Sequence, residues 1–277
     1  MTRLVSLAHL TALDTAPPDL IRMAADAGFG GAGLRMIGLS PEAVAWPLMD
    51  DAALLRETRR ACRETGLVVP DIEFIRLTPE LDVSTLESFV ATGAELGAQH
   101  VISAPYDPDL NRLADKLAAL QALAARYGLT TAIEFFPWTH VKDLATALSV
   151  IEKAGDPRIG VLVDSLHFDR SGAPWHELEQ VAPSRLPFAH LADAAPQMDR
   201  TNEGLIFVAR ESRLAPGEGA IDLVRFLRTL PPECNLSVEV PNAAQLRALG
   251  AARWIVHVGR ATQKLLQFLP SSVEASS

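Results

Sequence analysis

Four ionisable residues interrupt apolar segments in the second half of the chain. They are Glu134 in AIEFF, Asp164 in LVDSLH, His190 in FAHLAD and Glu239 in SVEVP. Burial of a lone charge is costly unless the charge is paired or binds a cation, so any one of them alone could be a salt-bridged or hydrogen-bonded strand residue. Together, three carboxylates and one imidazole form a mixed oxygen and nitrogen donor set. That set suits one divalent ion, Mn²⁺, Mg²⁺, Co²⁺ or Zn²⁺, with coordination positions left for a substrate.

The segments that carry these residues belong to a repeated pattern. Short apolar runs alternate with longer segments of helical period from one end of the chain to the other. Nearly continuous hydrophobicity, as in IGVLV at 159–163, is typical of parallel strands covered by helices. We expect eight strands, at residues 4–10, 31–36, 68–77, 100–106, 130–136, 160–167, 187–191 and 236–240.

Local signals predict where the first helices begin. Proline suits the first turn of a helix, and a Ser with a Glu three residues later is typical of a capping box. The starts are at Pro17 and Pro18, at Ser40 with Pro41, at Ser84 with Glu87, and at Asp107 with Pro108. Leucines at 110, 113, 117, 120 and 123 define one apolar face of the fourth helix.

Eight strands that are each followed by a helix favour a single (β/α)₈ TIM barrel over an open doubly wound sheet. No GxGxxG or Walker sequence supports a nucleotide cofactor. We expect one barrel domain over residues 1–270 and a solvated tail at 271–277. The carboxyl ends of barrel strands share one face, so Glu134, Asp164, His190 and Glu239 are expected to meet there.

Five short motifs share one resemblance: IEFFP at 133–137, VDSLHF at 163–168, HLADA at 190–194, PGEGAID at 216–222 and VEVPN at 238–242. Together they resemble the xylose-isomerase-like TIM barrel family. This family includes sugar and sugar-phosphate isomerases and epimerases, inosose and 3-dehydroshikimate dehydratases, and endonuclease-IV-type enzymes. The resemblance implies that the four residues above hold one divalent metal, and the Asp-x-x-His match nominates His167 as a residue that contacts substrate or supports a ligand. It also implies, by analogy, a homo-oligomer.

Proton transfer is the chemistry that such a centre supports. A metal chelated by the carbonyl and adjacent hydroxyl of a keto-sugar acidifies the C–H bond between them and stabilises the enediolate. Glu134 and Glu239 could then act as the catalytic acid and base, as the matching glutamates do in the epimerases that this chain resembles. Return of the proton gives an epimerase or an isomerase of a small keto-sugar, sugar phosphate or related polyol ketone. Loss of a β-hydroxyl instead gives a dehydratase of a cyclic keto-polyol, such as an inosose or a dehydroshikimate-like substrate.

The groups that fix the substrate are less distinctive. Arg213 could clamp a carboxylate, a phosphate or a pair of hydroxyls, or it could brace its loop. His9 is a candidate for substrate binding, although a hydrogen-bonded core histidine is the commoner role. Arg35 and Glu73 fall near strand ends, where a surface ion pair explains them equally well. Two other residues, Phe136 and Trp138, could wall one side of a pocket or pack beneath a loop.

Two further functions remain open on the same fold. A barrel that binds a sugar-like ligand or metal without turning it over is one, although the complete ligand set argues against it. Hydrolysis of abasic DNA is the other. It resembles the nuclease branch of the family, which uses a three-metal cluster and additional histidines after early strands, and no histidine ends the expected second, third or fourth strand here.

Composition limits the partners. The chain has 277 residues, 48% of them hydrophobic, and 34 acidic against 25 basic residues give a net charge of −9. This charge opposes attraction to nucleic acid or anionic lipid. The two cysteines, Cys62 and Cys234, form no CxxC pair, and no apolar run reaches membrane-spanning length. We therefore expect a cytoplasmic protein with reduced thiols, a small carbohydrate-like substrate, and no nucleic-acid or membrane partner.

Overall fold

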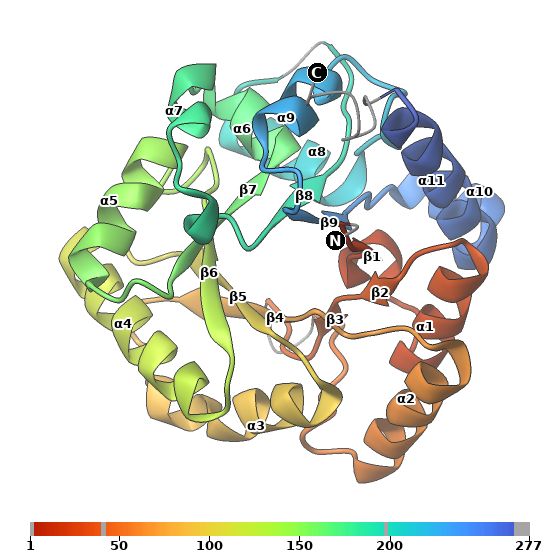
Figure 1. Cartoon of the computed structure of the whole chain (residues 1–277), viewed down its shortest axis with the longest axis horizontal. Coiled ribbons are helices and arrows are strands. Elements are labelled where there is room, and N and C mark those ends of the chain that lie inside the picture. The colour runs from red at the N-terminus through yellow and green to blue at the C-terminus, as the bar shows by residue number, and fades with distance from the viewer. Residues whose placement is uncertain (1–2, 40–42, 197–198, 269–277) are drawn as a thin grey trace, which may run out of the picture.

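Parallel strands form the centre of the fold and helices surround them (Figure 1). The computed structural model describes residues 3–39, 43–196 and 199–268. Neighbouring strands follow the order β2-β1-β9-β8-β7-β6-β5-β4-β3, and every pair is parallel. The strands are β1 Val5–Leu7, β2 Gly31–Ala32, β3 Leu34–Arg35, β4 Asp71–Leu77, β5 His100–Pro105, β6 Thr130–Glu134, β7 Gly160–Asp164, β8 Phe188–Leu191 and β9 Asn235–Val238.

The expected second strand is divided into β2 and β3 at Gly33. β2 pairs with β1, whereas β3 pairs with β4, so this one segment joins the two ends of the sheet. A side chain at Gly33 would collide with the carboxylate of Asp71, which explains why glycine occupies this point of close approach. With that division, the eight expected strands give the nine observed, and the predicted TIM barrel fold is confirmed.

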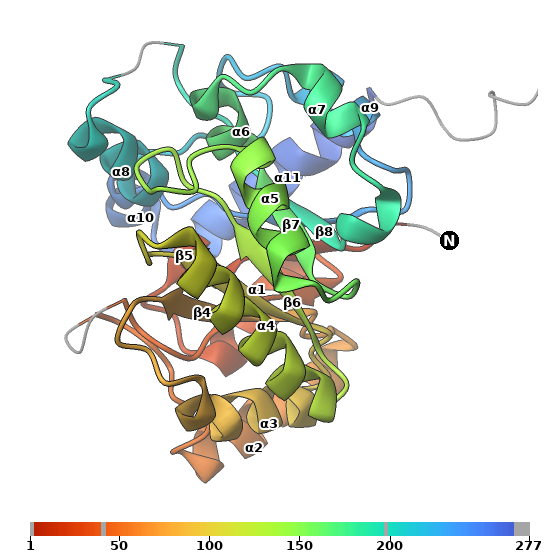
Figure 2. The ribbon, with the colours of Figure 1, turned by 90° about the vertical axis from the view of Figure 1, so that its left-hand side faces the viewer.

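Helices cover the outside of the barrel, as two perpendicular views show (Figures 1 and 2). Three short 3₁₀ segments, His9–Ala12, Val83–Leu86 and Pro183–Arg185, add to them. The α-helices are α1 Pro17–Asp26, α2 Ala52–Thr65, α3 Glu87–Leu96, α4 Leu110–Arg126, α5 Leu144–Ala154, α6 Ser165–Ser171, α7 Trp175–Glu179, α8 Asn202–Glu211, α9 Leu223–Thr229, α10 Ala243–Leu249 and α11 Ala251–Leu266.

Aspartates, rather than the expected residues, begin several helices. The proline start of α1 is confirmed. Ser40 and Pro41, the expected start of the second helix, lie outside the described residues. The helix α2 begins after Asp51, whose carboxylate accepts hydrogen bonds from two backbone N–H groups. The predicted capping box at Ser84 is wrong, because Asp82 accepts from the N–H of Ser84. Similarly, Asp109 caps α4. A carboxylate is a charged acceptor and satisfies the orphan N–H groups of a helix start well.

Several strands end earlier than expected, and two of these changes affect the site. The predicted strand 160–167 ends at Asp164, which caps α6, so His167 lies on a helix. The predicted strand 4–10 ends at Leu7, and a 3₁₀ turn follows, held by the Thr11 hydroxyl on Val238 O at 3.1 Å. Side-chain hydrogen bonds to the backbone therefore determine where these strands stop.

Two apolar regions hold the barrel together. The larger lies between the strands and the helices, and it includes Leu113, Leu117, Leu120 and Leu123 of α4, as predicted. The smaller fills one side of the barrel interior with Phe74, Ile102, Ala104, Ala132, Phe136, Leu162 and Phe188. The opposite side of the interior is therefore free to carry polar groups. The predicted tail at 271–277 lies outside the described residues.

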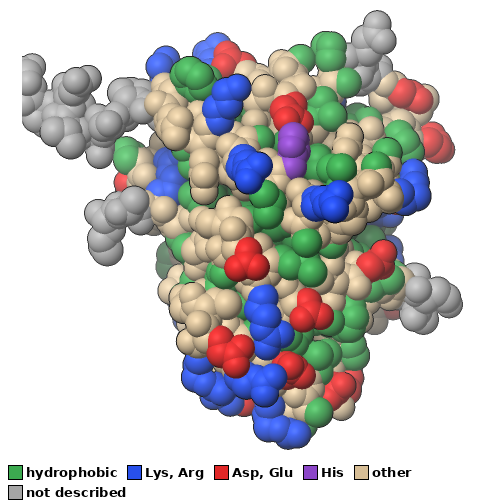
Figure 3. Space-filling view, turned by 90° about the vertical axis from the view of Figure 1, so that its right-hand side faces the viewer, with side chains coloured by type: hydrophobic (Ala, Val, Ile, Leu, Met, Phe, Trp, Pro, Cys, Tyr) green, Lys and Arg blue, Asp and Glu red, His purple; other side chains and the backbone are tan. Residues whose placement is uncertain are grey.

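The surface over α1 and α2 mixes both signs of charge (Figure 3). Arg22 lies 3.3 Å from Glu64, and Arg60 lies 2.9 Å from Glu57. Such exposed pairs contribute little stability each, but they leave no single-sign field on this face. Among the described helices, none is both long and apolar enough to cross a bilayer.

Candidate metal centre

The four residues singled out by the sequence lie together at the carboxyl ends of successive strands. Glu134 ends β6, Asp164 ends β7, His190 lies in β8, and Glu239 directly follows β9. Each offers one ligand atom, and these four atoms lie within 4.8 Å of one another. All four side chains are buried. The parallel register produces this proximity, because Asp164 pairs with His190 across β7 and β8.

The imidazole of His190 faces the three carboxylates without a hydrogen-bond partner. Its Nδ1 lies 3.3 Å from Glu134, 3.8 Å from Asp164 and 3.7 Å from Glu239. Neither ring nitrogen has a hydrogen-bond partner among the described residues, and the same is true of Glu134 Oε1. Buried polar atoms are normally satisfied, so these orphan atoms need a partner that protein groups do not supply. A divalent cation fits this donor set.

Electrostatics within the cluster reflect its burial. Burial disfavours the imidazolium, yet the carboxylates of Glu239 and Glu134 raise the pKa of His190 to about 10. Burial also raises the pKa of Glu134 to about 7, against the opposing effect of His190. Without a cation, the cluster therefore holds a proton on His190 at neutral pH. A cation that binds must displace this proton.

Asp164 has two structural tasks besides its place in the cluster. Its Oδ1 accepts from the N–H groups of Leu166 at 2.7 Å and His167 at 3.1 Å, which begins α6. Its Oδ2 accepts from Arg213 Nη1 at 2.5 Å. Burial opposes ionisation, but the nearby Arg213 holds the pKa of Asp164 below its usual value. Asp164 is thus an ionised carboxylate in a fixed orientation.

Arg213 connects two members of the cluster. Besides Asp164, its Nη2 lies 2.8 Å from Glu239 Oε2, and its Nε donates to Ala209 O at 2.8 Å. Asn242 holds the backbone of Arg213 in turn, through Nδ2 to Arg213 O at 2.8 Å. The two roles expected for Arg213, substrate clamp and loop brace, are therefore joined by a third, which is charge compensation for two carboxylates.

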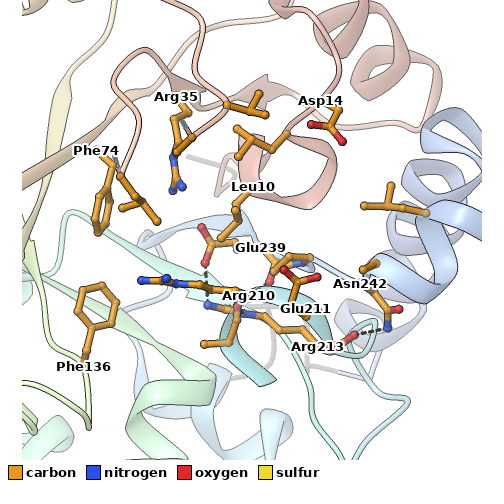
Figure 4. A pocket seen from close by; sticks show the side chains of 18 of the residues that line it. Leu10, Asp14, Arg35, Phe74, Phe136, Arg210, Glu211, Arg213, Glu239 and Asn242 are labelled. Carbon is orange, nitrogen blue, oxygen red and sulfur yellow. Dashed lines mark hydrogen bonds and ion pairs between the residues drawn. The ribbon is translucent and has the colours of Figure 1, made fainter. Parts of the chain in front are cut away.

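A cavity of about 390 Å³ opens onto the cluster (Figure 4). Glu134, Glu239, His167 and Arg213 all line it, together with an aromatic wall that includes Phe74, Tyr106, Phe136 and Trp138. The wall also answers the choice left open above, because Phe136 and Trp138 border the cavity. A ligand in the cavity would therefore contact apolar rings on one side and the ionised cluster on the other.

A comparison with known families confirms the resemblance noted in the sequence. The family model described as xylose isomerase-like TIM barrel matches residues 21–269. The chain belongs to this family.

Relatives of this xylose isomerase-like barrel include curated and solved proteins. An inosose isomerase of Bacillus velezensis (strain DSM 23117 / BGSC 10A6 / LMG 26770 / FZB42) is 27% identical over 158 residues, which are 53% of this chain and 54% of the relative. The chain thus matches about half the length of that curated relative. The structure of the IOLI protein with a binding zinc atom has a TM-score of 0.80 at 19% identity, covering 97% of this chain and 99% of the other. The probable 3-DHS dehydratase AsbF of Bacillus anthracis has a TM-score of 0.75 at 13% identity, covering 94% and 98%.

In this xylose isomerase-like barrel, His167 points its ring at the aromatic wall. The ring meets Phe136 and Trp138 edge-on, with centroids 4.9 and 5.1 Å apart, and its Nε2 lies 3.9 Å from Glu134. Burial lowers the pKa of His167 to about 3. The side chain is therefore a neutral imidazole beside the cluster, where it can donate or accept one hydrogen bond.

His9 lies outside the cavity lining and makes backbone contacts with both ring nitrogens. Its Nδ1 accepts from the N–H of Arg35 at 3.0 Å, so its Nε2 carries the proton and donates to Thr15 O at 2.9 Å. Burial lowers the pKa of His9 to about 4. This geometry favours the hydrogen-bonded core histidine, the alternative that the sequence left open.

Arg35 and Glu73 form a buried ion pair, so the surface ion pair that the sequence left open as one alternative does not form. Their side chains are 4% and 2% exposed, and Nη2 of Arg35 lies 3.0 Å from Oε2 of Glu73. Arg35 also lines the cavity. Arg35 ends β3, whereas Glu73 lies inside β4, and the sequence alone does not show that the rest of the fold buries this pair.

Asp193 organises the loop that carries Arg213. Its carboxylate accepts from the N–H groups of Gly217 at 3.1 Å, Gly219 at 2.9 Å and Ile221 at 3.0 Å. The backbone of Asp193 also pairs with Leu214. The PGEGAID motif is thus a loop folded around one buried carboxylate.

Proposed function

We propose that this protein is a divalent-metal-dependent isomerase or epimerase of a small keto-sugar, sugar phosphate or related polyol ketone. The observation that carries the proposal is the buried set of Glu134, Asp164, His190 and Glu239 with unpartnered ligand atoms beside a cavity. The partial likeness to inosose isomerases supports an isomerase acting on a polyol ketone. Zinc in the IOLI structure supports a divalent metal in a barrel of this shape.

In this proposal Glu134, Asp164, His190 and Glu239 hold the ion. When bound, the ion would draw electron density from a substrate carbonyl and acidify the adjacent C–H bond. The protein residues supply the proton transfer. Glu134 lines the cavity, and a carboxylate that holds the ion through one oxygen can use its other oxygen to take up or give up a proton.

Glu239 is the second proton carrier in the proposal. It enters the cavity from β9, and the intervening β7 and β8 separate it from Glu134 on β6. Arg213 holds Glu239 Oε2, which leaves Oε1 to transfer a proton to or from the substrate. Two carboxylates that approach a substrate from different strands can remove a proton on one face and return it on the other, which is what an epimerase requires.

A metal-dependent dehydratase of a cyclic keto-polyol is the second candidate. The observation in its favour is the aromatic wall of Phe74, Tyr106, Phe136 and Trp138, since the C–H face of a six-membered ring packs well on such surfaces. The fold likeness to the probable 3-DHS dehydratase is in keeping with this alternative. The same glutamates would remove the α-proton and supply a proton to the departing β-hydroxyl, so that water leaves and a C=C bond forms between the α- and β-carbons.

Incubation in D₂O separates these functions. Protein loaded in turn with Mn²⁺, Mg²⁺, Co²⁺ and Zn²⁺ is mixed with 2-keto-myo-inositol, D-fructose, a ketose phosphate and 3-dehydroshikimate, and the products are followed by NMR. Deuterium at the α-carbon of unreacted ketone or its epimer supports the isomerase or epimerase, and an unsaturated product supports the dehydratase. Binding without exchange across the panel contradicts both and favours the binding protein.

The variant Glu239→Gln provides the control for this experiment. We expect it to lose exchange by more than about 1,000-fold while it still binds metal, because a neutral amide keeps an oxygen ligand but cannot carry the proton. Exchange at the wild-type rate in Glu239→Gln would contradict the assigned role of Glu239.

A further inference from the structure

The ion pair of Arg35 and Glu73 is incomplete. An arginine and a carboxylate commonly form two parallel hydrogen bonds, yet here only Arg35 Nη2 donates to Glu73 Oε2, at 3.0 Å. Arg35 Nε and Glu73 Oε1 are buried and have no hydrogen-bond partner among the described residues. An unsatisfied buried polar group is unfavourable, so a pair kept only for stability would be expected to form both hydrogen bonds.

The surrounding protein holds Arg35 in this position. The N–H of Arg35 donates to His9 Nδ1, and the backbone O of Glu73 accepts from the N–H of Met36 at 2.8 Å. The guanidinium carbon lies 5.1 Å from the centroid of Phe74, which belongs to the aromatic wall. The backbone hydrogen bonds, the Phe74 ring and the Glu73 carboxylate thus hold the guanidinium in place, although only its Nη2 donates a hydrogen bond within the described residues.

The guanidinium points into the cavity, toward the side where Glu239 lies (Figure 4). Arg213, the other buried arginine of this cavity, is already bonded to Asp164, Glu239 and Ala209 O. Arg35 has no such second acceptor among the described residues. Of these two buried arginines, Arg35 is the one that still has donors to offer a ligand.

We propose that Arg35 contacts the substrate and donates a hydrogen bond to one of its oxygens, and that Glu73 and His9 are positioning residues for this guanidinium. Glu73 neutralises the charge of Arg35, so the group acts as a directed donor and suits a hydroxyl or carbonyl oxygen of a polyol ketone. The inference rests on the proposed function for the identity of the substrate. Under this proposal, the hydrogen bond from the backbone N–H of Arg35 to His9 Nδ1 helps to hold Arg35 in the position from which it reaches the substrate.

Steady-state exchange of 2-keto-myo-inositol in D₂O by the metal-loaded protein tests the proposal. We expect Arg35→Ala to lower kcat/KM by about 100-fold or more, Arg35→Lys to recover only part, and added guanidinium to restore Arg35→Ala at least tenfold while ammonium does not. Glu73→Gln should lower kcat/KM less than Arg35→Ala, because the amide still accepts from Arg35. The surface variant Arg158→Gln, whose side chain pairs with Asp156, is the matched control and should behave as wild type.

Removing one member of a buried pair can also unfold a protein. The double variant Arg35→Met with Glu73→Gln removes both charges at similar volume, and circular dichroism verifies its fold. It should show the same loss of kcat/KM as Arg35→Ala, with the Kd for Mn²⁺ within threefold of wild type. A merely structural pair would leave kcat/KM near wild type in this folded double variant, and that result would overturn the proposal.

Binding of myo-inositol to the Mn²⁺-loaded protein, measured by calorimetry, separates the two levels of inference. Exchange that proceeds equally in wild type and Arg35→Ala overturns the role of Arg35 and leaves the proposed function intact. Binding that is tenfold weaker in Arg35→Ala, without exchange in wild type, supports the contact and overturns the isomerase. Neither binding nor exchange in wild type overturns both.

Discussion

Arg213 donates to Asp164 from Nη1 to Oδ2 at 2.5 Å, and both side chains are almost completely buried. The contact ties the loop after α8 to the end of β7. The same guanidinium also reaches Glu239, so one arginine compensates two of the four cluster residues. In the absence of a cation, this arginine and the imidazolium of His190 are the positive charges that balance the three carboxylates.

Arg213→Gln should therefore make the thermal stability of the protein depend more strongly on bound metal. Removing one partner of a buried ion pair typically costs about 3–5 kcal/mol, because the remaining carboxylates lose their compensation. We expect a large fall in Tm for the metal-free variant and a rise on adding Mn²⁺ or Zn²⁺ that exceeds the rise in wild type. Differential scanning fluorimetry with EDTA and with metal measures both. Equal metal-induced shifts in the two proteins would contradict the compensating role of Arg213.

Metal affinity should increase with pH. The pKa of His190 is about 10 in the metal-free fold, whereas an ordinary histidine has about 6.5, so the imidazolium stabilises that fold below pH 6.5 and this contribution is lost as pH rises through 10. Between pH 7.5 and 9, binding of the metal must release this one proton, and the Kd should fall about tenfold per pH unit. Below pH 7 the slope should steepen, because Glu134 must also lose a proton.

Calorimetry in buffers of different ionisation enthalpy counts the released protons. His190→Gln should bind metal more weakly and release fewer protons than wild type at pH 9. Nearer neutral pH it should still release a proton from Glu134, whose pKa rises further once the opposing effect of His190 is gone. His176→Gln, a change at an exposed histidine on α7, is the matched control and should keep the wild-type proton count. A proton count at pH 9 that is unchanged in His190→Gln would show that another group carries the proton.

His167 should act as a neutral group. Burial lowers its pKa to about 3, so it does not titrate between pH 5 and 9. His167→Gln keeps a neutral hydrogen-bonding side chain but loses the edge-on contacts with Phe136 and Trp138, and we expect kcat/KM to fall by about 10- to 100-fold with the shape of its pH profile unchanged. A profile that loses one limb in the variant would show that His167 titrates after all.

Asp193→Ala should loosen the loop at residues 213–221. The change leaves four buried or half-buried N–H groups, those of Ala194, Gly217, Gly219 and Ile221, without their charged acceptor, at a cost of about 3 kcal/mol or more. Hydrogen exchange followed by mass spectrometry should show faster exchange in peptides from this loop. Asp82→Ala, which removes a carboxylate cap on a distant 3₁₀ turn, should affect only its own segment.

The sequence determined the barrel and the four residues of its centre. An apolar strand pattern with one charged residue at each of four strand ends needs only the common direction of parallel strands to bring those residues together, so Glu134, Asp164, His190 and Glu239 could be found without coordinates. The helix starts were less certain, because several residues near each boundary can cap a helix and only local geometry selects Asp82 over Ser84.

Only the tertiary structure decided the roles of the arginines and of His9. Whether a charged residue at a strand end is exposed depends on loops that are distant in sequence, and these loops bury Arg35 with Glu73 and Arg213 with Asp164. The two ring nitrogens of His9 are committed to Arg35 and Thr15 by the turn after β1, which no sequence period reveals. Strand pattern is a local property, whereas burial and hydrogen-bond satisfaction belong to the whole fold, and that difference separates what could be predicted from what could not.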